Sequence, residues 1–180
     1  MRRSRVLYAC CSGIIRYLCV LFLLLLVTGC ANTSTTIVDE EVVTNQKPMA
    51  TYKSLIINEF ELKNELFTNV PESMMTERER RYSQIPAILT ENIERYVNSR
   101  HTYSSVTRNG KPTETSLVLK GKFTRVGRFR ISIVATLHDG ANGYEVAYFR
   151  QTLWDVLDTT EAVNLLGRDI ADFIDRIQYK

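Results

Sequence analysis

Cysteine is missing from most of this chain, because all four cysteines lie within the first 30 residues, at Cys10, Cys11, Cys19 and Cys30. The residues after Cys30 therefore cannot form a disulfide bond, a cysteine nucleophile or a thiolate metal site. A domain built from them must be held together by its apolar core alone. A chain of about 130 residues is long enough for one such core.

Histidine is scarce as well, since His101 and His138 are the only two. The sequence has no Gly-x-Ser-x-Gly nucleophile elbow, no His-Glu-x-x-His zinc helix and no phosphate-binding glycine loop. We therefore expect no catalytic site, no metal site and no cofactor. One alternative stays open, a small periplasmic hydrolase or other enzyme that uses His138 together with the adjacent Asp139.

The longest apolar run is too short to cross a membrane, because it has only 11 residues, from 17 to 27, whereas a membrane-spanning helix needs about 20. Basic residues before it, the short run itself and the small residues after it are together typical of a secretory signal peptide. We predict that residues 1–29 are this signal, cleaved between Gly29 and Cys30. The basic residues are Arg2, Arg3, Arg5 and Arg16.

The end of this segment, Leu26-Val27-Thr28-Gly29-Cys30, resembles a bacterial lipobox. The resemblance implies that Cys30 carries a diacylglycerol thioether and an acylated amino terminus, and several acyl chains anchor a protein durably. Ala31 follows the cysteine, whereas an Asp at that position retains enterobacterial lipoproteins at the inner membrane. We therefore expect a lipid-anchored protein on the periplasmic face of the outer membrane.

The net charge of +3 belongs to the signal segment. Residues 1–29 hold four of the 23 Lys and Arg residues and none of the 20 Asp and Glu residues. The remaining chain thus has slightly more acidic than basic side chains, so its charge gives no reason to expect nucleic acid as a partner.

We predict two segments after the cleavage site. Residues 30–50 are interpreted as the lipidated cysteine and a flexible tether, because the segment Asn32–Thr36 is polar and Pro48 precedes the first convincing apolar run. Residues 51–180 are expected to form a single periplasmic α/β domain without internal repeats.

Hydrophobic periodicity predicts an α/β (α+β) domain with the order β-α-β-β-β-β-α. We expect one mixed sheet of about five strands, with two helices packed on one of its faces. The charged segment 76–81 is interpreted as a solvated face. Strands are predicted at 54–60, 103–107, 115–125, 128–138 and 144–154, and helices are predicted to begin at Ser83 and at Asp158.

The apolar pattern also predicts which side chains share a face. Alternation places one apolar set on the same face of each of two strands, Leu117, Leu119 and Phe123 on the first and Phe129, Ile131 and Ile133 on the second. In the first helix Pro86 falls within the first turn, where proline is tolerated. The last helix is predicted to bury a stripe that runs from Val163 to Ile177.

Two helices on one face leave the opposite face of the sheet partly polar. There we expect a basic stripe of Arg128, Arg130 and Arg150, close to Tyr144 and Tyr148. Such a stripe suits an acidic protein or an anionic polymer, and aromatic side chains contribute to recognition of both. These five residues are the candidate partner-binding residues, although isolated surface arginines are commonly only solvated.

Four segments carry a resemblance to small periplasmic lipoproteins with the fold of the N-terminal domain of the Tol-system propeller protein. They are the opening strand Lys53–Ile57, the segment Leu117–Lys122, the segment Ile133–Gly143, in which a strand runs into the turn Asp139–Gly143, and the apolar last helix. The curli-secretion lipoprotein, the Pel-polysaccharide lipoprotein and the penicillin-binding-protein activators are comparable. The resemblance implies a non-enzymatic binding or assembly accessory of an envelope, secretion or polysaccharide-export system. It also implies a docking module or a ring of copies, which makes a homo-oligomer one expectation.

Overall fold

The computed structural model describes residues 35–44, 47–62, 71–127 and 129–179. The predicted signal peptide, its cleavage site and Cys30 lie outside these residues. Among the described helices, none has both the length and the hydropathy that a membrane span requires.

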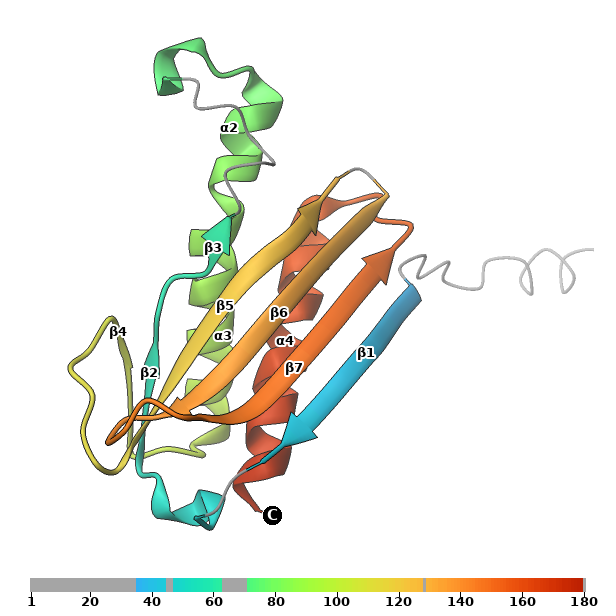
Figure 1. Cartoon of the computed structure of the whole chain (residues 1–180). Coiled ribbons are helices and arrows are strands. Elements are labelled where there is room, and N and C mark those ends of the chain that lie inside the picture. Colours follow the sequence, from blue (N-terminus) through green and yellow to red (C-terminus); the bar gives the residue numbers. More distant parts are fainter. Residues whose placement is uncertain (1–34, 45–46, 63–70, 128, 180) are drawn as a thin grey trace, which may run out of the picture. The chain divides into compact units, whose positions relative to one another are not determined.

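One sheet and two main helices make up the described domain, and both helices lie on the same face of the sheet (Figure 1). The strand order is β1-β7-β6-β5-β2-β4, and β3 pairs with β5 beside this path. A short helix, α2, leads directly into α3. The bounds are β1 Thr35–Val43, β2 Ser54–Ile57, β3 Glu61–Leu62, α2 Glu77–Ser83, α3 Ile85–Arg100, β4 Ser105–Arg108, β5 Ser116–Val126, β6 Arg130–Asp139, β7 Glu145–Trp154 and α4 Thr159–Gln178, with 3-10 turns at Met49–Thr51 and Glu72–Met74.

The predicted architecture is confirmed in its class, in its mixed sheet and in the placement of both helices on one face. β2 runs parallel to β4 and β5, whereas β5, β6 and β7 form an antiparallel meander. The sheet nevertheless has more strands than the predicted five. The additional strands are β1, at one edge, and the two-residue β3.

The prediction of a flexible tether over residues 30–50 is wrong for much of that range, because Thr35–Val43 forms β1 and pairs antiparallel with β7. The acidic residues of this strand have partners in distant parts of the chain. Asp39 accepts a hydrogen bond from the Thr152 hydroxyl at 2.6 Å, and Glu41 forms an ion pair with Arg176 of α4. An edge strand tolerates such polarity because one of its sides is exposed.

The charged segment 76–81 is helical, in addition to being exposed as predicted. Thr76 and Glu79 form a capping box, in which the Thr76 side chain accepts from the Glu79 N–H and the Glu79 carboxylate accepts from the Thr76 N–H. None of the residues of α2 is buried, so hydrophobic periodicity could not reveal this helix. The core-facing helix α3 begins only at Ile85, with Pro86 in its first turn as predicted.

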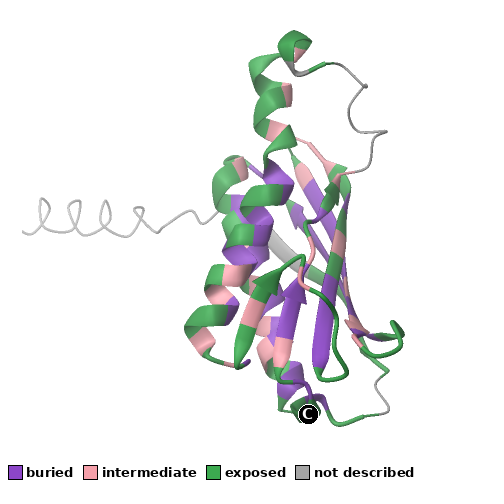
Figure 2. Ribbon diagram, turned by 90° about the vertical axis from the view of Figure 1, so that its left-hand side faces the viewer, coloured by how far each residue is buried: buried purple, intermediate pink, exposed green. Residues whose placement is uncertain are grey.

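The core lies between the two helices and the sheet face that they cover, where the buried residues of Figure 2 meet. The predicted apolar stripe of α4 is buried, and the ring of Phe173 lies 5.1 Å from that of Phe149 on β7. Gly121 of β5 is required by packing, since a Cβ there would lie 2.1 Å from the Phe60 ring. Phe129, which we expected to face this core, precedes β6 and is exposed.

Candidate functional site

The face of the sheet opposite the helices is the candidate site. Successive side chains of a strand point to opposite faces, so the buried residues Leu117, Leu119 and Phe123 of β5 face the helices. Lys120 and Lys122, which alternate with them, point to the other face and are exposed. None of the described helices covers this second face, as Figures 1 and 2 show. We call it the open face.

The register of β5, β6 and β7 places basic residues in neighbouring rows of the open face. Lys122 lies opposite Val134, which in turn lies opposite Arg150, so the three form one row. With strands about 4.8 Å apart, the Cα atoms of Lys122 and Arg150 are about 10 Å apart. The next row contains Lys120, beside Thr136 and Tyr148.

Acidic residues of β1 partly offset this positive charge at one edge of the open face. Asp39 lies 3.7 Å from the Arg150 guanidinium, measured from Oδ2 to Nε, and Glu40 is opposite Arg150 in the register. At the other edge, the exposed Glu61 of β3 pairs with Lys122 of β5 in the register and so lies beside it. Lys120 has the uncharged Thr136 opposite it on β6.

Arg130 lies at the end of the open face where β6 begins and β7 ends. Its guanidinium carbon is 4.4 Å from the centroid of the Trp154 ring, and its Nε donates a hydrogen bond to Ser132 at 3.2 Å. Stacking of a guanidinium on an indole ring is a favourable cation–π arrangement. Arg130 and Trp154 thus place a charged group directly beside an apolar ring.

The structure separates several of the predicted partner-binding residues. Arg130 and Arg150 both point to the open face, but they are far apart along the strands. Arg150 is opposite Val134, which is four residues after Arg130 on β6, a distance of about 13 Å along the strand. Tyr148 is half-buried on this face, between Thr136 and Val42. Tyr144 lies in the turn before β7, and Arg128 lies outside the described residues.

Sequence reasoning missed Lys120 and Lys122 as part of this surface. The signal was present, because the alternation that predicted Leu117, Leu119 and Phe123 on the covered face also assigns both lysines to the opposite face. The open face therefore has its basic residues on β5 as well as on β6 and β7.

His138 and Asp139 are adjacent in the sequence but point to opposite faces of β6, so the structure does not bring the pair together. The His138 ring forms hydrogen bonds with the Thr136 hydroxyl at 2.9 Å and the Gly143 carbonyl at 3.0 Å. Asp139 is buried, and its carboxylate accepts from Lys47 at 2.7 Å and from the Tyr52 hydroxyl at 3.0 Å. The proposed histidine–aspartate site thus loses its geometric basis.

Asp139 has a structural role that its hydrogen bonds explain. Burial alone would raise its pKa, but the bonds from Lys47, the Ala141 N–H and Tyr52 outweigh burial and hold the pKa below its usual value. Burial and the neighbouring carboxylate of Asp139 raise the pKa of Tyr52 to about 12. The hydrogen bonds from Lys47 and Tyr52 to Asp139 therefore join the segment before β2 to the end of β6.

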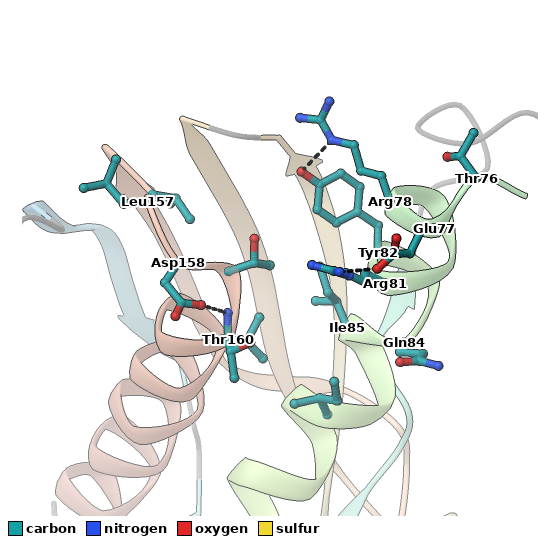
Figure 3. A pocket seen from close by; sticks show the side chains of 14 residues that line it. Thr76, Glu77, Arg78, Arg81, Tyr82, Gln84, Ile85, Leu157, Asp158 and Thr160 are labelled. Atoms are coloured by element: carbon teal, nitrogen blue, oxygen red, sulfur yellow. Dashed lines mark hydrogen bonds and ion pairs between the residues drawn. The ribbon is translucent and has the colours of Figure 1, made fainter.

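A groove opens between α2, the start of α3 and the start of α4 (Figure 3). It has a volume of about 830 Å³ and contains Arg78 and Arg81 on one side and Leu157 on the other. Arg81 forms an ion pair with Glu77, and Arg78 donates to the Tyr82 hydroxyl at 3.4 Å. These cations already have partners within α2. The described part of the chain also contains no cluster of three acidic, histidine or cysteine residues that could hold a metal ion.

The sequence matches no protein-family model and no curated protein. The structure is similar to two dodecamers of PelC from Paraburkholderia phytofirmans, one of them a single-residue variant. Each has 10% identity over 79% of this chain and 98% of the PelC chain, with TM-scores of 0.53 and 0.51. A Xanthomonas campestris protein covers 76% of this chain and 93% of its own, at 13% identity and a TM-score of 0.48. The chain therefore shares the PelC fold, which confirms that part of the predicted resemblance, whereas the resemblance to the Tol-system and curli proteins stays a prediction.

Proposed function

We propose that this chain is a lipoprotein anchored through Cys30 at the periplasmic face of the outer membrane, where it acts as a non-enzymatic docking or assembly accessory. The observation that carries this proposal is the open face, on which Lys120, Lys122 and Arg150 lie in neighbouring rows without a covering helix among the described residues. The separation of His138 from Asp139 removes the main reason to expect an enzyme.

The open face fits an acidic partner, either a protein of the cell envelope or an anionic polymer. Lys120 and Lys122 lie two residues apart on the same side of β5, and Tyr148 lies across β6 from Lys120. Charge complementarity of this kind steers association and weakens as salt screens it. An aromatic ring beside the cations adds contact area.

The shared fold also supports association between copies of this chain, because both PelC structures are dodecamers. A ring of copies would repeat the open face around an axis and would make binding to a long partner multivalent. An envelope, secretion or polysaccharide-export system would supply such a partner.

Charge reversal on the open face tests the proposal. The variant Lys120→Glu/Lys122→Glu should fold normally and should lose capture of the partner in crosslinked pull-downs from the cell envelope. The matched control is Arg80→Glu/Arg168→Glu, which changes the net charge equally at exposed positions of α2 and α4. Retained capture by the first variant, or equal loss in the control, would show that the open face is not the docking surface.

His138→Ala separates the docking proposal from the enzyme alternative. Since the His138 ring bonds only to Thr136 and Gly143 among the interactions described, its removal should leave cellular function intact. A loss of function with the fold preserved would favour an enzyme.

A further inference from the structure

One end of the domain gathers exposed apolar side chains from three separate segments. They are Phe129, before β6, Trp154, at the end of β7, and Leu157, before α4, with exposures of 62%, 41% and 77%. Arg130 pairs with Trp154 in the register, which places the first two segments side by side, and Leu157 follows three residues after Trp154. Scattered apolar residues need no explanation, but a group at one end with a polar rim marks a contact surface.

The strand β1 begins at this same end, because Thr35 pairs with Trp154. Thr35 is only five positions after Cys30, and a chain of that length can span at most about 17 Å. A lipid on Cys30 would therefore hold the bilayer surface close to Trp154. The opposite end of β7 is a whole strand away, about 33 Å for its ten residues.

The side chains at this end match the chemistry of a bilayer surface. Tryptophan prefers the headgroup region, where its ring is apolar and its N–H is polar. Arg130 stacks on the Trp154 ring with its guanidinium 4.4 Å from the ring centroid, so its charge lies beside the ring. Arg125, at the end of β5, is also exposed near this end. Arginines in such positions can reach lipid phosphates while their aliphatic parts stay in apolar surroundings.

We propose that the end of the domain formed by Phe129, Arg130, Trp154 and Leu157 docks on the phospholipid bilayer. Trp154 and Leu157 enter the headgroup region, and Arg125 and Arg130 contact lipid phosphates. This docking rests on the proposed lipidation of Cys30 and adds an orientation to it. The strands then point toward the membrane, and the open face stands at a steep angle to the bilayer, where it is accessible to a periplasmic partner.

The fluorescence of Trp154 tests this docking, because Trp154 is the only tryptophan in the chain. Full-length lipidated protein is reconstituted into vesicles of phosphatidylethanolamine and phosphatidylglycerol, and flotation establishes that the protein is anchored. Brominated phospholipids should quench Trp154 several-fold more strongly than iodide does from the water phase. Leu157→Asp should reverse this preference while the protein still floats.

The matched control is Tyr144→Asp, at a residue as exposed as Leu157 but at the other end of β7. It should leave the quenching unchanged. Flotation together with free quenching by iodide and none by brominated lipid would overturn the docking and leave the anchor intact. Protection from both quenchers would also overturn it, because a protein would then cover this end. Failure to float would overturn both the anchor and the docking.

Discussion

The two faces of β5, β6 and β7 differ in burial and in polarity. Leu119, Ile133 and Phe149 point toward the helices and are fully buried, whereas the residues that follow them, Lys120, Val134 and Arg150, point to the open face. The identity and size of the residues in the first set are constrained by packing between the sheet and the helices. The residues of the second set do not pack against the helices, so their identity can be set by contact with a partner. Substitutions should therefore affect stability on the covered face and binding on the open face.

The largest effect is expected from Phe173→Ala on the covered face. The ring is buried between α4 and β7, with its centroid 5.1 Å from that of Phe149. Its removal should lower the free energy of unfolding by about 3–5 kcal/mol, as large-to-small changes in a core do. Urea denaturation of the protein without its signal peptide measures this change. An unchanged midpoint would show that α4 does not belong to the core.

Gly121→Ala should have the next largest effect, because the added Cβ would overlap the Phe60 ring on the covered face. We expect a loss of about 1–3 kcal/mol in the free energy of unfolding, typical of overpacking. Gly127→Ala is the control, since the nearest atom to its added Cβ is 3.7 Å away. Similar midpoints for both variants in the same urea titration would disprove the packing of Phe60 against β5.

Tyr52→Phe should cost about 1 kcal/mol, the usual contribution of a hydrogen bond, by removing the donor to Asp139. Because the pKa of Tyr52 is raised from 10.0 to about 12 in the folded protein, the fold favours the neutral phenol. This stabilisation is complete below pH 10 and is lost as the pH rises toward about 12. The difference in urea midpoint between wild type and Tyr52→Phe should therefore shrink over this interval. A difference that does not depend on pH would exclude the proposed role of the Tyr52 proton.

Lys120→Glu/Lys122→Glu should have the smallest effect on stability. Both side chains are exposed on the open face, and exposed substitutions usually change the free energy of unfolding by no more than about 0.5 kcal/mol. Urea denaturation of this variant and of the wild type measures the change in the free energy of unfolding. A loss comparable to that of Phe173→Ala would mean that the open face is part of the folding core.

Much of the covered face could be predicted from the sequence, because burial leaves a periodic pattern. Alternation identified β5, β6 and β7, and the spacing from Val163 to Ile177 identified the buried side of α4. β1 was missed because its polar residues are paired through tertiary contacts. Asp39 and Glu41 find partners in Thr152 and Arg176, more than 100 residues later in the chain, and no local pattern records such pairs.

The open face was predictable only in outline. Alternation correctly placed Arg130 and Arg150 away from the helices, but the spacing between them depends on the β6–β7 register, which the sequence alone does not show. The adjacency of His138 and Asp139 favoured a site that strand geometry separates. A sequence motif within a strand should thus be judged by residues two apart, since those share a face.

Photo-crosslinking in the intact cell envelope compares the two sides of the domain under native conditions. A photoreactive phenylalanine analogue replaces Val134, between Lys122 and Arg150 on the open face, or Glu91, on the exposed side of α3. If the open face is the docking surface, the analogue at position 134 forms a specific adduct that high salt abolishes, and the analogue at position 91 forms none. An adduct from position 91 alone, in cells where both variants are folded and functional, would show that the partner binds the helices and not the open face.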